Sequence, residues 1–214
     1  MKKGVFISLE GPDGSGKSTQ LTQMKMLLDK KGYNCVATRE PGGTVISEKI
    51  RGLVLDKEYS EMDCRTEALL YAAARAQHVA EVIKPALERG DVVICDRFVD
   101  SSIVYQGYGR KLSREKVAAI NEFAIAGCMP DMTFLFKLDP EIGKSRIEAG
   151  TRDRLESELT EFHSEVFRGY EEMEKLYPSR IVGIDAGGSV DEIHSKVAWH
   201  LEMLLKEKYD ACRY

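Results

Sequence analysis

A glycine-rich segment at residues 11–18, Gly-Pro-Asp-Gly-Ser-Gly-Lys-Ser, constrains this chain more than any other feature. It fills every fixed position of the G-x-x-x-x-G-K-[ST] phosphate-binding loop. The apolar run 5–9 before it has the pattern of a buried strand, and residues 19–31 after it repeat apolar side chains at helical spacing. A strand, loop and helix in this order turn backbone N–H groups and the positive helix end toward one anion. The sequence therefore predicts a nucleoside triphosphate ligand, with a ligand-free glycine turn as the alternative.

Two side chains of the loop have specific expected roles. Lys17 is predicted to reach the β and γ phosphates, and the hydroxyl of Ser18 is predicted to coordinate Mg²⁺. The glycines allow successive backbone N–H groups to turn inward around the phosphate oxygens. The residues predicted to bind the triphosphate are Gly11, Pro12, Asp13, Gly14, Ser15, Gly16, Lys17, Ser18 and Thr19.

Length and composition limit what can surround the loop. The 214 residues, 43% of them hydrophobic, can bury one substantial core, and no linker divides them, so we expect a single domain over residues 1–214. A net charge of −4 without a basic face argues against a nucleic-acid partner. The five cysteines lack the spacing of a disulfide framework or a zinc site. No apolar run is long enough for a membrane span, so we predict a soluble, cytoplasmic protein.

Strand and helix patterns alternate along the chain, which is typical of a parallel sheet covered by helices on both faces. Asp139-Pro140 is a helix-start signal, and Ser189 to Glu192 is a capping box. We therefore predict an α/β fold of the three-layer P-loop NTPase type with a five-stranded parallel sheet. Strands are expected at 4–9, 34–38, 91–95, 132–138 and 180–184, and helices at 17–31, 44–55, 65–88, 113–127, 140–149, 158–176 and 189–207.

A second polar cluster follows the strand expected at 91–95. Asp96 is placed at the tip of that strand, where ligands bind in open α/β sheets, and its carboxylate is suited to hold Mg²⁺ or its waters. Arg97 follows at once and suits a second anion, whereas an ATPase that activates water often has a second acid there. A surface ion pair is the alternative. Because the chain has no Asn-Lys-x-Asp run, a guanine-reading GTPase switch is disfavoured.

Further segments contain groups suited to a substrate pocket. Residues 38–44, Thr-Arg-Glu-Pro-Gly-Gly-Thr, join an arginine to glycines that let backbone approach a ligand closely. Arg51 and Arg75 can each grip a phosphate, or be solvated helix charges. Residues 100–107 bring together hydroxyls, an amide and an aromatic ring, which a pocket for a nucleotide base needs.

These segments together resemble the ordered signature of thymidylate kinases. The blocks that carry the resemblance are 10–19, 38–44, 70–77 and 96–107, and it continues through Asp153-Arg154 and Phe162-His163 over nearly the whole chain. The Arg-Glu-Pro-Gly-Gly and Tyr-Gln-Gly blocks are far more specific than the phosphate loop alone. The resemblance implies a nucleoside-monophosphate-kinase fold, often a homodimer, that transfers the γ-phosphoryl group of ATP to dTMP with Mg²⁺ and yields ADP and dTDP for dTTP biosynthesis.

The family pattern, carried over residue by residue, implies a thymine pocket. Tyr71 would stack on the base, and Arg75 would read its edge, with Ser102 and Gln106 near the ring. The family commonly has Phe at the position of Tyr71, so the added hydroxyl needs a partner or water.

The same pattern implies how the rest of dTMP is held. Arg51 and Arg97 would bind the monophosphate, Asp13 would approach the sugar 3′-hydroxyl, and Tyr105 would crowd the 2′ position. Glu40 and Arg39 would organise the acceptor end and its metal waters. The implied dTMP-binding residues are Asp13, Arg39, Glu40, Arg51, Tyr71, Arg75, Arg97, Ser102, Tyr105 and Gln106, and the implied Mg²⁺ ligands are Ser18, Asp96 and Glu40, partly through water.

Transfer also needs a positive group on the migrating phosphoryl. Some thymidylate kinases have an arginine inside the phosphate loop, but residues 12–15 here are Pro, Asp, Gly and Ser. We therefore predict a mobile lid at 146–156 with Gly150 as a hinge, although a charged connection between two helices is the alternative. Arg146, Arg152 and Arg154 are candidates, and Arg152 and Arg154 are preferred. The expected catalytic residues are Lys17, Arg97, Arg152, Arg154 and Asp13.

A phosphate acceptor is already a nucleophile, so catalysis depends on positioning and charge rather than on a His or Ser nucleophile. We therefore expect the four histidines, His78, His163, His194 and His200, to be structural. Two other functions stay open: a P-loop kinase for another nucleotide or nucleoside, and a regulatory protein that binds a nucleotide without turnover. The pocket residues favour dTMP, and the complete set of phosphate-binding cations disfavours a protein without turnover.

Overall fold

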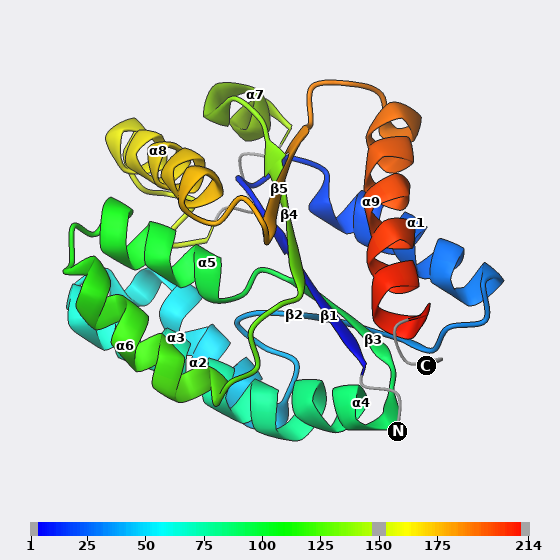
Figure 1. The fold of residues 1–214 in the computed structure, drawn as a ribbon. Coiled ribbons are helices and arrows are strands. Elements are labelled where there is room, and N and C mark those ends of the chain that lie inside the picture. Colours follow the sequence, from blue (N-terminus) through cyan, green and yellow to red (C-terminus); the bar gives the residue numbers. More distant parts are fainter. Residues whose placement is uncertain (1–3, 147–152, 211–214) are drawn as a thin grey trace.

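The computed structural model describes residues 4–146 and 153–210. Its centre is a sheet in which every strand is parallel to its neighbours, with the order β2-β3-β1-β4-β5 (Figure 1). This confirms the predicted α/β fold. The strands are β1 Val5–Glu10, β2 Cys35–Arg39, β3 Val92–Asp96, β4 Met132–Lys137 and β5 Ile181–Asp185.

Several helices begin at caps that the sequence supplies. Thr44 Oγ1 accepts a hydrogen bond from the backbone N–H of Ser47 at 3.1 Å, which satisfies a free donor at the start of α2. Most helices follow the predicted pattern closely. They are α1 Lys17–Lys30, α2 Val45–Leu55, α3 Cys64–His78, α4 Lys84–Arg89, α5 Val99–Ser102, α6 Arg114–Ile125, α7 Pro140–Ser145, α8 Thr160–Leu176 and α9 Val190–Asp210, with a 3-10 turn η1 Lys57–Tyr59 and π-helical segments η2 Val79–Ile83 and η3 Ile103–Gly109.

Residues 99–109 form a helical segment that the sequence patterns did not predict, because Gly107 and Gly109 lower helix propensity there. Contacts of η3 with α8 and α6 stabilise it instead. The helix expected at 65–88 becomes π-helical from residue 79. The helix expected at 140–149 ends at Ser145, and most of its remainder lies outside the described residues.

The two faces of the sheet are buried by different helices. Alternate residues of β1, Val5, Ile7 and Leu9, belong to one apolar cluster with side chains of α1 and α9. Figure 1 shows these two helices together on one side of the sheet. On the other side Phe6 packs with residues of η2 and α4, and Leu135 packs with α8. The sheet is thus the middle of three layers, as predicted.

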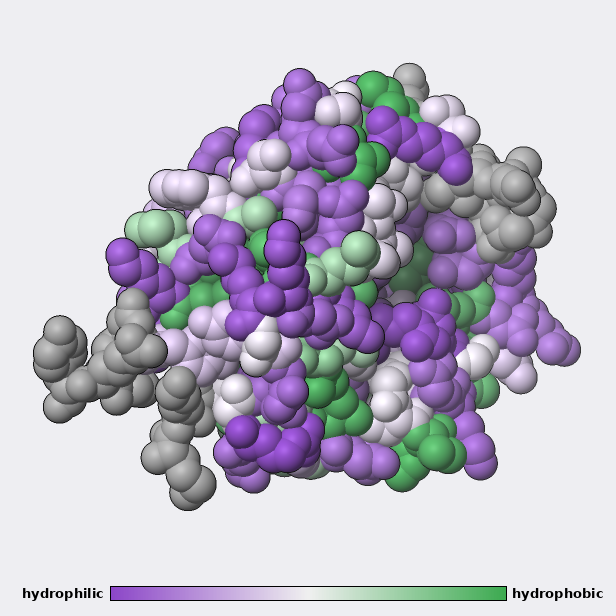
Figure 2. Space-filling model, turned by 90° about the vertical axis from the view of Figure 1, so that its right-hand side faces the viewer, coloured by the Kyte–Doolittle hydropathy of each residue, from purple (hydrophilic) through white to green (hydrophobic). Residues whose placement is uncertain are grey.

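The outer surface of α1 and α9 is shown in Figure 2, where hydrophilic residues cover most of the area and apolar residues form small separate patches. Trp199 and Met203 of α9 are among the exposed apolar side chains. In the described part of the chain, no helix combines the length and the apolar character that crossing a bilayer requires.

The strand order brings the predicted functional segments to one edge. In the parallel register Asp96 of β3 lies beside Leu9 of β1 and Arg39 of β2. The loops that leave these three strands therefore begin side by side at their carboxyl ends. This edge is where open α/β sheets bind their ligands.

Candidate active site

The phosphate loop connects β1 to α1 and is held by close backbone contacts. Gly11 has φ 132°, and a Cβ there would collide with the carbonyl of Phe136. Lys17 Nζ donates to the carbonyls of Gly11 at 3.0 Å and Pro12 at 2.8 Å. Burial, together with the charge of Arg97, lowers the pKa of Lys17 to about 8. Ser15 Oγ is buried and has no hydrogen-bond partner among the described residues.

The loop also contacts α7 directly. Gly14 has φ 76°, and a Cβ there would collide with the carbonyl oxygen of Gly143 in α7. A Cβ on Gly143 would in turn lie 2.5 Å from the carbonyl oxygen of Asp13. The guanidinium of Arg146, which follows α7, donates to the carbonyl of Gly14 at 3.2 Å. The beginning of the predicted lid therefore lies against the phosphate loop.

Asp96 ends β3 with one side-chain oxygen that lacks a partner. Its Oδ1 is buried and accepts no hydrogen bond from the residues that the structure describes. A buried carboxylate oxygen without a donor is costly unless a cation or a ligand satisfies it. Ser18 lines the same cavity, so the oxygens of these two residues suit a hard divalent cation.

Arg97 has φ 66°, in the left-handed region that residues other than glycine rarely adopt. Its Nη2 donates to Asp13 Oδ1 at 2.6 Å, and its Nη1 donates to the Tyr170 hydroxyl at 3.3 Å. Burial alone would raise the pKa of Asp13, but the charges of Arg97 and Lys17 outweigh burial and lower it to about 2. An ionised carboxylate thus faces two cations at the edge of the phosphate loop.

Glu10 is a buried carboxylate that the sequence analysis did not assign to the site. Its Oε1 accepts the backbone N–H of Phe98 at 2.8 Å, and its Oε2 accepts the hydroxyls of Ser101 at 2.5 Å and Tyr170 at 2.9 Å. Burial and the nearby Asp100 raise its pKa to about 7, against the opposite effect of these hydrogen bonds and of Arg97. Glu10 therefore fixes the segment that follows β3. The sequence feature that could have identified Glu10 is its position at the end of a buried strand, where ligands bind in open α/β sheets.

Most of the predicted site residues line one cavity of about 450 Å³. It extends from the phosphate loop, past the ends of β2 and β3, to α3 and η3. This size suits a small-molecule ligand. The predicted site residues that line it are Asp13, Gly14, Gly16, Lys17, Ser18, Thr19, Arg39, Glu40, Arg51, Tyr71, Arg75, Asp96, Arg97, Ser102, Tyr105 and Gln106.

Arg75 lies at the end of the cavity away from the phosphate loop and is 1% exposed. Its Nε donates to Glu40 at 2.7 Å and its Nη2 to the Phe98 carbonyl at 2.9 Å. Its Nη1 donates to Ser102 Oγ at 2.8 Å and also to Asn121 Oδ1. A guanidinium has five N–H donors, so these four bonds leave one donor, on Nη2, for a ligand.

Glu40 is engaged by protein groups on both of its oxygens. Oε2 accepts from Arg75, and Oε1 is 2.9 Å from His78 Nδ1. Each oxygen of Glu40 thus already has one protein partner, and the role of Glu40 toward Mg²⁺, partly through water, stays a prediction. In the structure Glu40 holds Arg75.

A second buried carboxylate, Glu67, organises the neighbouring wall of the cavity. It accepts from Gln106 Nε2 at 2.8 Å and from Arg154 Nη2 at 2.6 Å. Because an ionised carboxylate only accepts, the amide nitrogen of Gln106 must face Glu67. The amide oxygen is then left without a partner among the described residues. Glu67 was not singled out from the sequence.

The predicted lid arginines have different positions. Arg154 is buried, donates to the Val54 carbonyl at 2.9 Å as well as to Glu67, and does not line the cavity. This ion pair makes Arg154 unsuited to the predicted contact with a migrating phosphoryl group. Arg152 lies outside the described residues. Arg146, the third candidate, lines the cavity beside the phosphate loop.

Comparison with known proteins assigns the chain to a family. The model of the family described as thymidylate kinase matches residues 9–197. The chain belongs to the thymidylate kinase family. It is 50% identical over 196 residues to the thymidylate kinase of Halalkalibacterium halodurans, an alignment that covers 90% of this chain and 93% of that protein. It is also 50% identical over 212 residues to the thymidylate kinase of Lactobacillus helveticus, covering 96% and 99%.

A solved structure agrees with these relatives. The crystal structure of thymidylate kinase from Ehrlichia chaffeensis superimposes with a TM-score of 0.75 at 33% sequence identity, and the match covers 93% of this chain and 99% of that one. The family and the fold that the sequence predicted are thereby confirmed. As a member of the thymidylate kinase family the chain is a kinase.

Within this thymidylate kinase, two acidic residues of the cavity wall were missed. Asp153 and Glu156 line the cavity and cap each other: Glu156 N donates to Asp153 Oδ1 at 2.8 Å, and Asp153 N donates to Glu156 Oε2 at 2.9 Å. Burial raises the pKa of Glu156. The Asp-x-x-Glu spacing is a capping pattern and was the signal for this turn.

Proposed function

We propose that this thymidylate kinase transfers the γ-phosphoryl group of ATP to dTMP within the cavity, and releases ADP and dTDP. ATP would occupy the end formed by the phosphate loop, and dTMP the end formed by α3 and η3. The two nucleotides would then meet beside Arg97, which lies between these ends and lines the cavity.

The donor end supports this placement through its unsatisfied groups. The buried Ser15 hydroxyl has no partner among the described residues, no side chain caps the first turn of α1, and Lys17 supplies a positive charge, so these groups are available to phosphate oxygens. Asp96 Oδ1 and Ser18 would hold Mg²⁺, which neutralises phosphate charge when it is bound. Ligand and metal would thus satisfy groups that the protein leaves open.

The acceptor phosphate has two negative charges and must approach a second charged phosphate, so it needs cations around it. Arg97 is well placed because Asp13 and Tyr170 fix its guanidinium. Arg51 is held by the Pro41 carbonyl at 2.9 Å, and Arg39 is paired with Glu48 at 3.0 Å. Positioning and charge stabilisation by these residues would supply most of the catalysis.

The observation that carries the choice of thymine is the pair of unsatisfied groups at the far end of the cavity. Arg75 has one free N–H donor, and Gln106 has one free amide acceptor. Thymine presents a carbonyl oxygen next to a ring N–H, which matches a donor beside an acceptor. Cytosine presents an amino group and a ring nitrogen acceptor at these positions. The Arg75 donor would then face another donor, and the Gln106 acceptor would face another acceptor, so neither hydrogen bond would form. Tyr71 would stack on the ring.

Two further assignments complete the site. Asp13, which is ionised beside Arg97, would approach the sugar 3′-hydroxyl, and Tyr105 would crowd the 2′ position and favour deoxyribose. For the migrating phosphoryl group we favour Arg146, because it already contacts the phosphate loop, with Arg152 as the other candidate.

The test is a coupled ADP-release assay with Mg-ATP and a panel of dTMP, dUMP, dCMP, UMP, dGMP and thymidine. Preference for dTMP, with dUMP reduced by about 10–200-fold for the missing methyl group, is the expected result. Preference for another acceptor would overturn the pocket assignment but leave the phosphate chemistry. Binding of ATP without transfer would indicate a regulatory nucleotide-binding protein.

We also propose a cytoplasmic homodimer that associates through α2, α3 and α6. Helix α2 packs against α3, and α3 packs against α6. These helices expose large apolar side chains, of which Phe123 is 88% exposed and Leu69 is 56% exposed. A second copy of the chain would bury them. Light scattering should give twice the chain mass of 24.0 kDa, Phe123→Glu should give a monomer, and the control Lys196→Glu, at an exposed position of α9 outside the proposed interface, should stay dimeric. A monomeric wild type would exclude this interface.

A further inference from the structure

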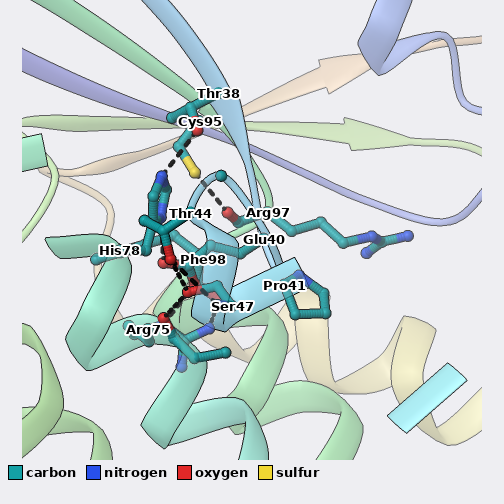
Figure 3. Close-up of polar contacts among 12 residues, drawn as sticks. Thr38, Glu40, Pro41, Thr44, Ser47, Arg75, His78, Cys95, Arg97 and Phe98 are labelled. Carbon is teal, nitrogen blue, oxygen red and sulfur yellow. Dashed lines mark hydrogen bonds and ion pairs between the residues drawn. The ribbon is translucent and has the colours of Figure 1, made fainter. Parts of the chain in front are cut away.

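A continuous series of buried and part-buried hydrogen bonds connects the end of β2 to Arg75. Thr38 Oγ1 lies 2.8 Å from His78 Nε2, His78 Nδ1 lies 2.9 Å from Glu40 Oε1, and Glu40 Oε2 accepts from Arg75 Nε at 2.7 Å. Figure 3 shows His78 between Thr38 and Glu40, with Arg75 at the far end. This series of hydrogen bonds thus links Thr38 of β2 to Arg75, which lines the cavity.

The direction of each bond to Glu40 follows from the chemistry of the groups. Glu40, beside the guanidinium of Arg75, acts as a carboxylate and can only accept, so His78 must donate from Nδ1. His78 is fully buried, Glu40 is 4% exposed and Arg75 1% exposed, so water does not compete for the bonds among these three residues. The bond to Glu40 therefore requires a proton on His78 Nδ1.

The cluster also meets the distance requirement of a metal site, since ligand atoms of Glu40, His78 and Cys95 all lie within 4.8 Å of one another. Its bonding does not suit an ion. Both Glu40 oxygens and both ring nitrogens of His78 already have partners, and the cation of Arg75 lies against the carboxylate. Burial raises the pKa of the Cys95 thiol, which donates to the Arg97 carbonyl at 3.1 Å. A network for positioning explains these contacts better than a metal site does.

The backbone after β2 is shaped around the imidazole. Gly43 has φ 83°, and a Cβ there would lie 2.7 Å from His78 and 2.8 Å from Thr38 Oγ1. The glycine in the Arg-Glu-Pro-Gly-Gly segment therefore leaves room for the ring of His78 between α3 and this loop. Histidine at this place is built into the site and does more than fill the core.

We propose that His78 is a positioning residue for base selection, which acts through Glu40 on Arg75. This inference rests on the proposed reading of thymine by Arg75. The Nδ1–H bond of His78 fixes the Glu40 carboxylate, and Glu40 fixes the Nε side of the Arg75 guanidinium. Only one N–H donor of Arg75 is left for the base. The direction of that N–H depends on how the other four hydrogen bonds hold the plane of the guanidinium. Loss of the His78 donor frees the Glu40 carboxylate and lets the guanidinium plane turn.

The test compares two substitutions of His78 that differ in one donor. His78→Asn places an amide N–H near the position of Nδ1 and keeps the bond to Glu40, whereas His78→Leu removes it. The measurement is kcat/KM for dTMP and for dCMP with Mg-ATP. We expect His78→Leu to lower the dTMP-to-dCMP ratio about tenfold, mainly through a higher KM for dTMP, as fits the loss of one hydrogen bond to a charged group. His78→Asn should restore the ratio to within about threefold of wild type.

The ratio does not depend on how much of the enzyme is folded, so a purely structural role for His78 would lower both activities and leave the ratio unchanged. That result, or an asparagine variant that behaves like leucine, would overturn the inference. Should His78→Leu fail to accumulate, His78→Gln serves instead, because its amide reaches the Nε2 position and leaves Glu40 without this donor. Arg75→Ala is measured in parallel. An unchanged ratio in Arg75→Ala would refute the base-reading function itself, whereas a lowered ratio in Arg75→Ala but not in His78→Leu would refute only the role of His78.

Discussion

The two ends of the cavity are built in opposite ways. At the phosphate end, Ser15 Oγ and Asp96 Oδ1 are buried without partners among the described residues. At the base end, Arg75 has four internal hydrogen bonds, and among the described residues one N–H of Arg75 Nη2 and the amide oxygen Oε1 of Gln106 are left without a partner. Phosphates and a cation have enough charge to satisfy open groups on arrival. A neutral base does not, so the groups that select it must be held in place beforehand.

The largest expected effect is at the phosphate end. Lys17→Ala should lower kcat/KM for ATP by about a thousandfold or more, because the charge that it brings to the β and γ phosphates has no substitute. Steady-state kinetics with saturating dTMP measures this loss. The control Lys25→Ala changes an exposed lysine of the same helix and should keep wild-type rates. Full activity of Lys17→Ala would remove the assignment of the donor site.

At the base end, Arg75→Ala should lower the dTMP-to-dCMP ratio of kcat/KM by about a hundredfold, because the site loses its donor to the thymine carbonyl. Competition between the two acceptors in one assay measures the ratio. Arg65→Ala alters an exposed arginine at the start of the same helix and should leave the ratio unchanged. If Arg75→Ala lowered kcat/KM for dTMP and for dCMP equally, Arg75 would not select the base. The proposed difference between an open phosphate end and a pre-positioned base end would then be contradicted.

A smaller effect is expected at Asp96. Asp96→Asn keeps the size of the side chain but replaces a carboxylate oxygen with a neutral amide, so the concentration of Mg²⁺ for half-maximal rate should rise about thirtyfold. Titration of the rate with Mg²⁺ at fixed ATP measures this shift, and Asp29→Asn on the exposed side of α1 is the matched control. An unchanged Mg²⁺ requirement would contradict the idea that Asp96 Oδ1 awaits a cation.

A further effect, on stability rather than on rate, is expected from Glu10. Burial raises the folded-state pKa of Glu10 to about 7, above its ordinary value, so the folded protein binds this proton more tightly than the unfolded chain does. The free energy of unfolding should therefore fall by up to about 3 kcal/mol as pH rises from about 4.5 to 7. Urea unfolding of wild type and Glu10→Gln across this range isolates the contribution, with exposed Glu122→Gln as control. Parallel pH profiles for wild type and Glu10→Gln would contradict the shift.

Sequence patterns predicted well the features that depend on residues close together in the sequence. The phosphate loop, the five strands and most helices are local features, in which spacing and turn residues determine the conformation. The helical segment 99–109 was missed because its glycines oppose a helix and tertiary contacts with α6 and α8 decide it. Local pattern therefore fails where packing outweighs propensity.

For the candidate site, it was easier to predict which residues line the cavity than to predict which residues they bind. Asp96 and Arg75 were singled out and line the cavity, and their roles stay predictions. The partners of Glu40 and Arg154 were not predicted, because each pairs with an oppositely charged residue of another element. His78 was expected to be merely structural because nothing in the sequence indicates that it meets Glu40. Such pairings arise only when distant segments fold together.

The backbone contact between Gly14 and Gly143 also limits how this enzyme can evolve. Neither position has space for a side chain unless the other segment moves away, since each Cβ would collide with the other's backbone or its neighbour's. An arginine at residue 14 of the phosphate loop is therefore accessible to this chain only after a change in α7, more than a hundred positions further on. The two glycines form an epistatic pair, and a variant with a cation at residue 14 requires a change in α7 first.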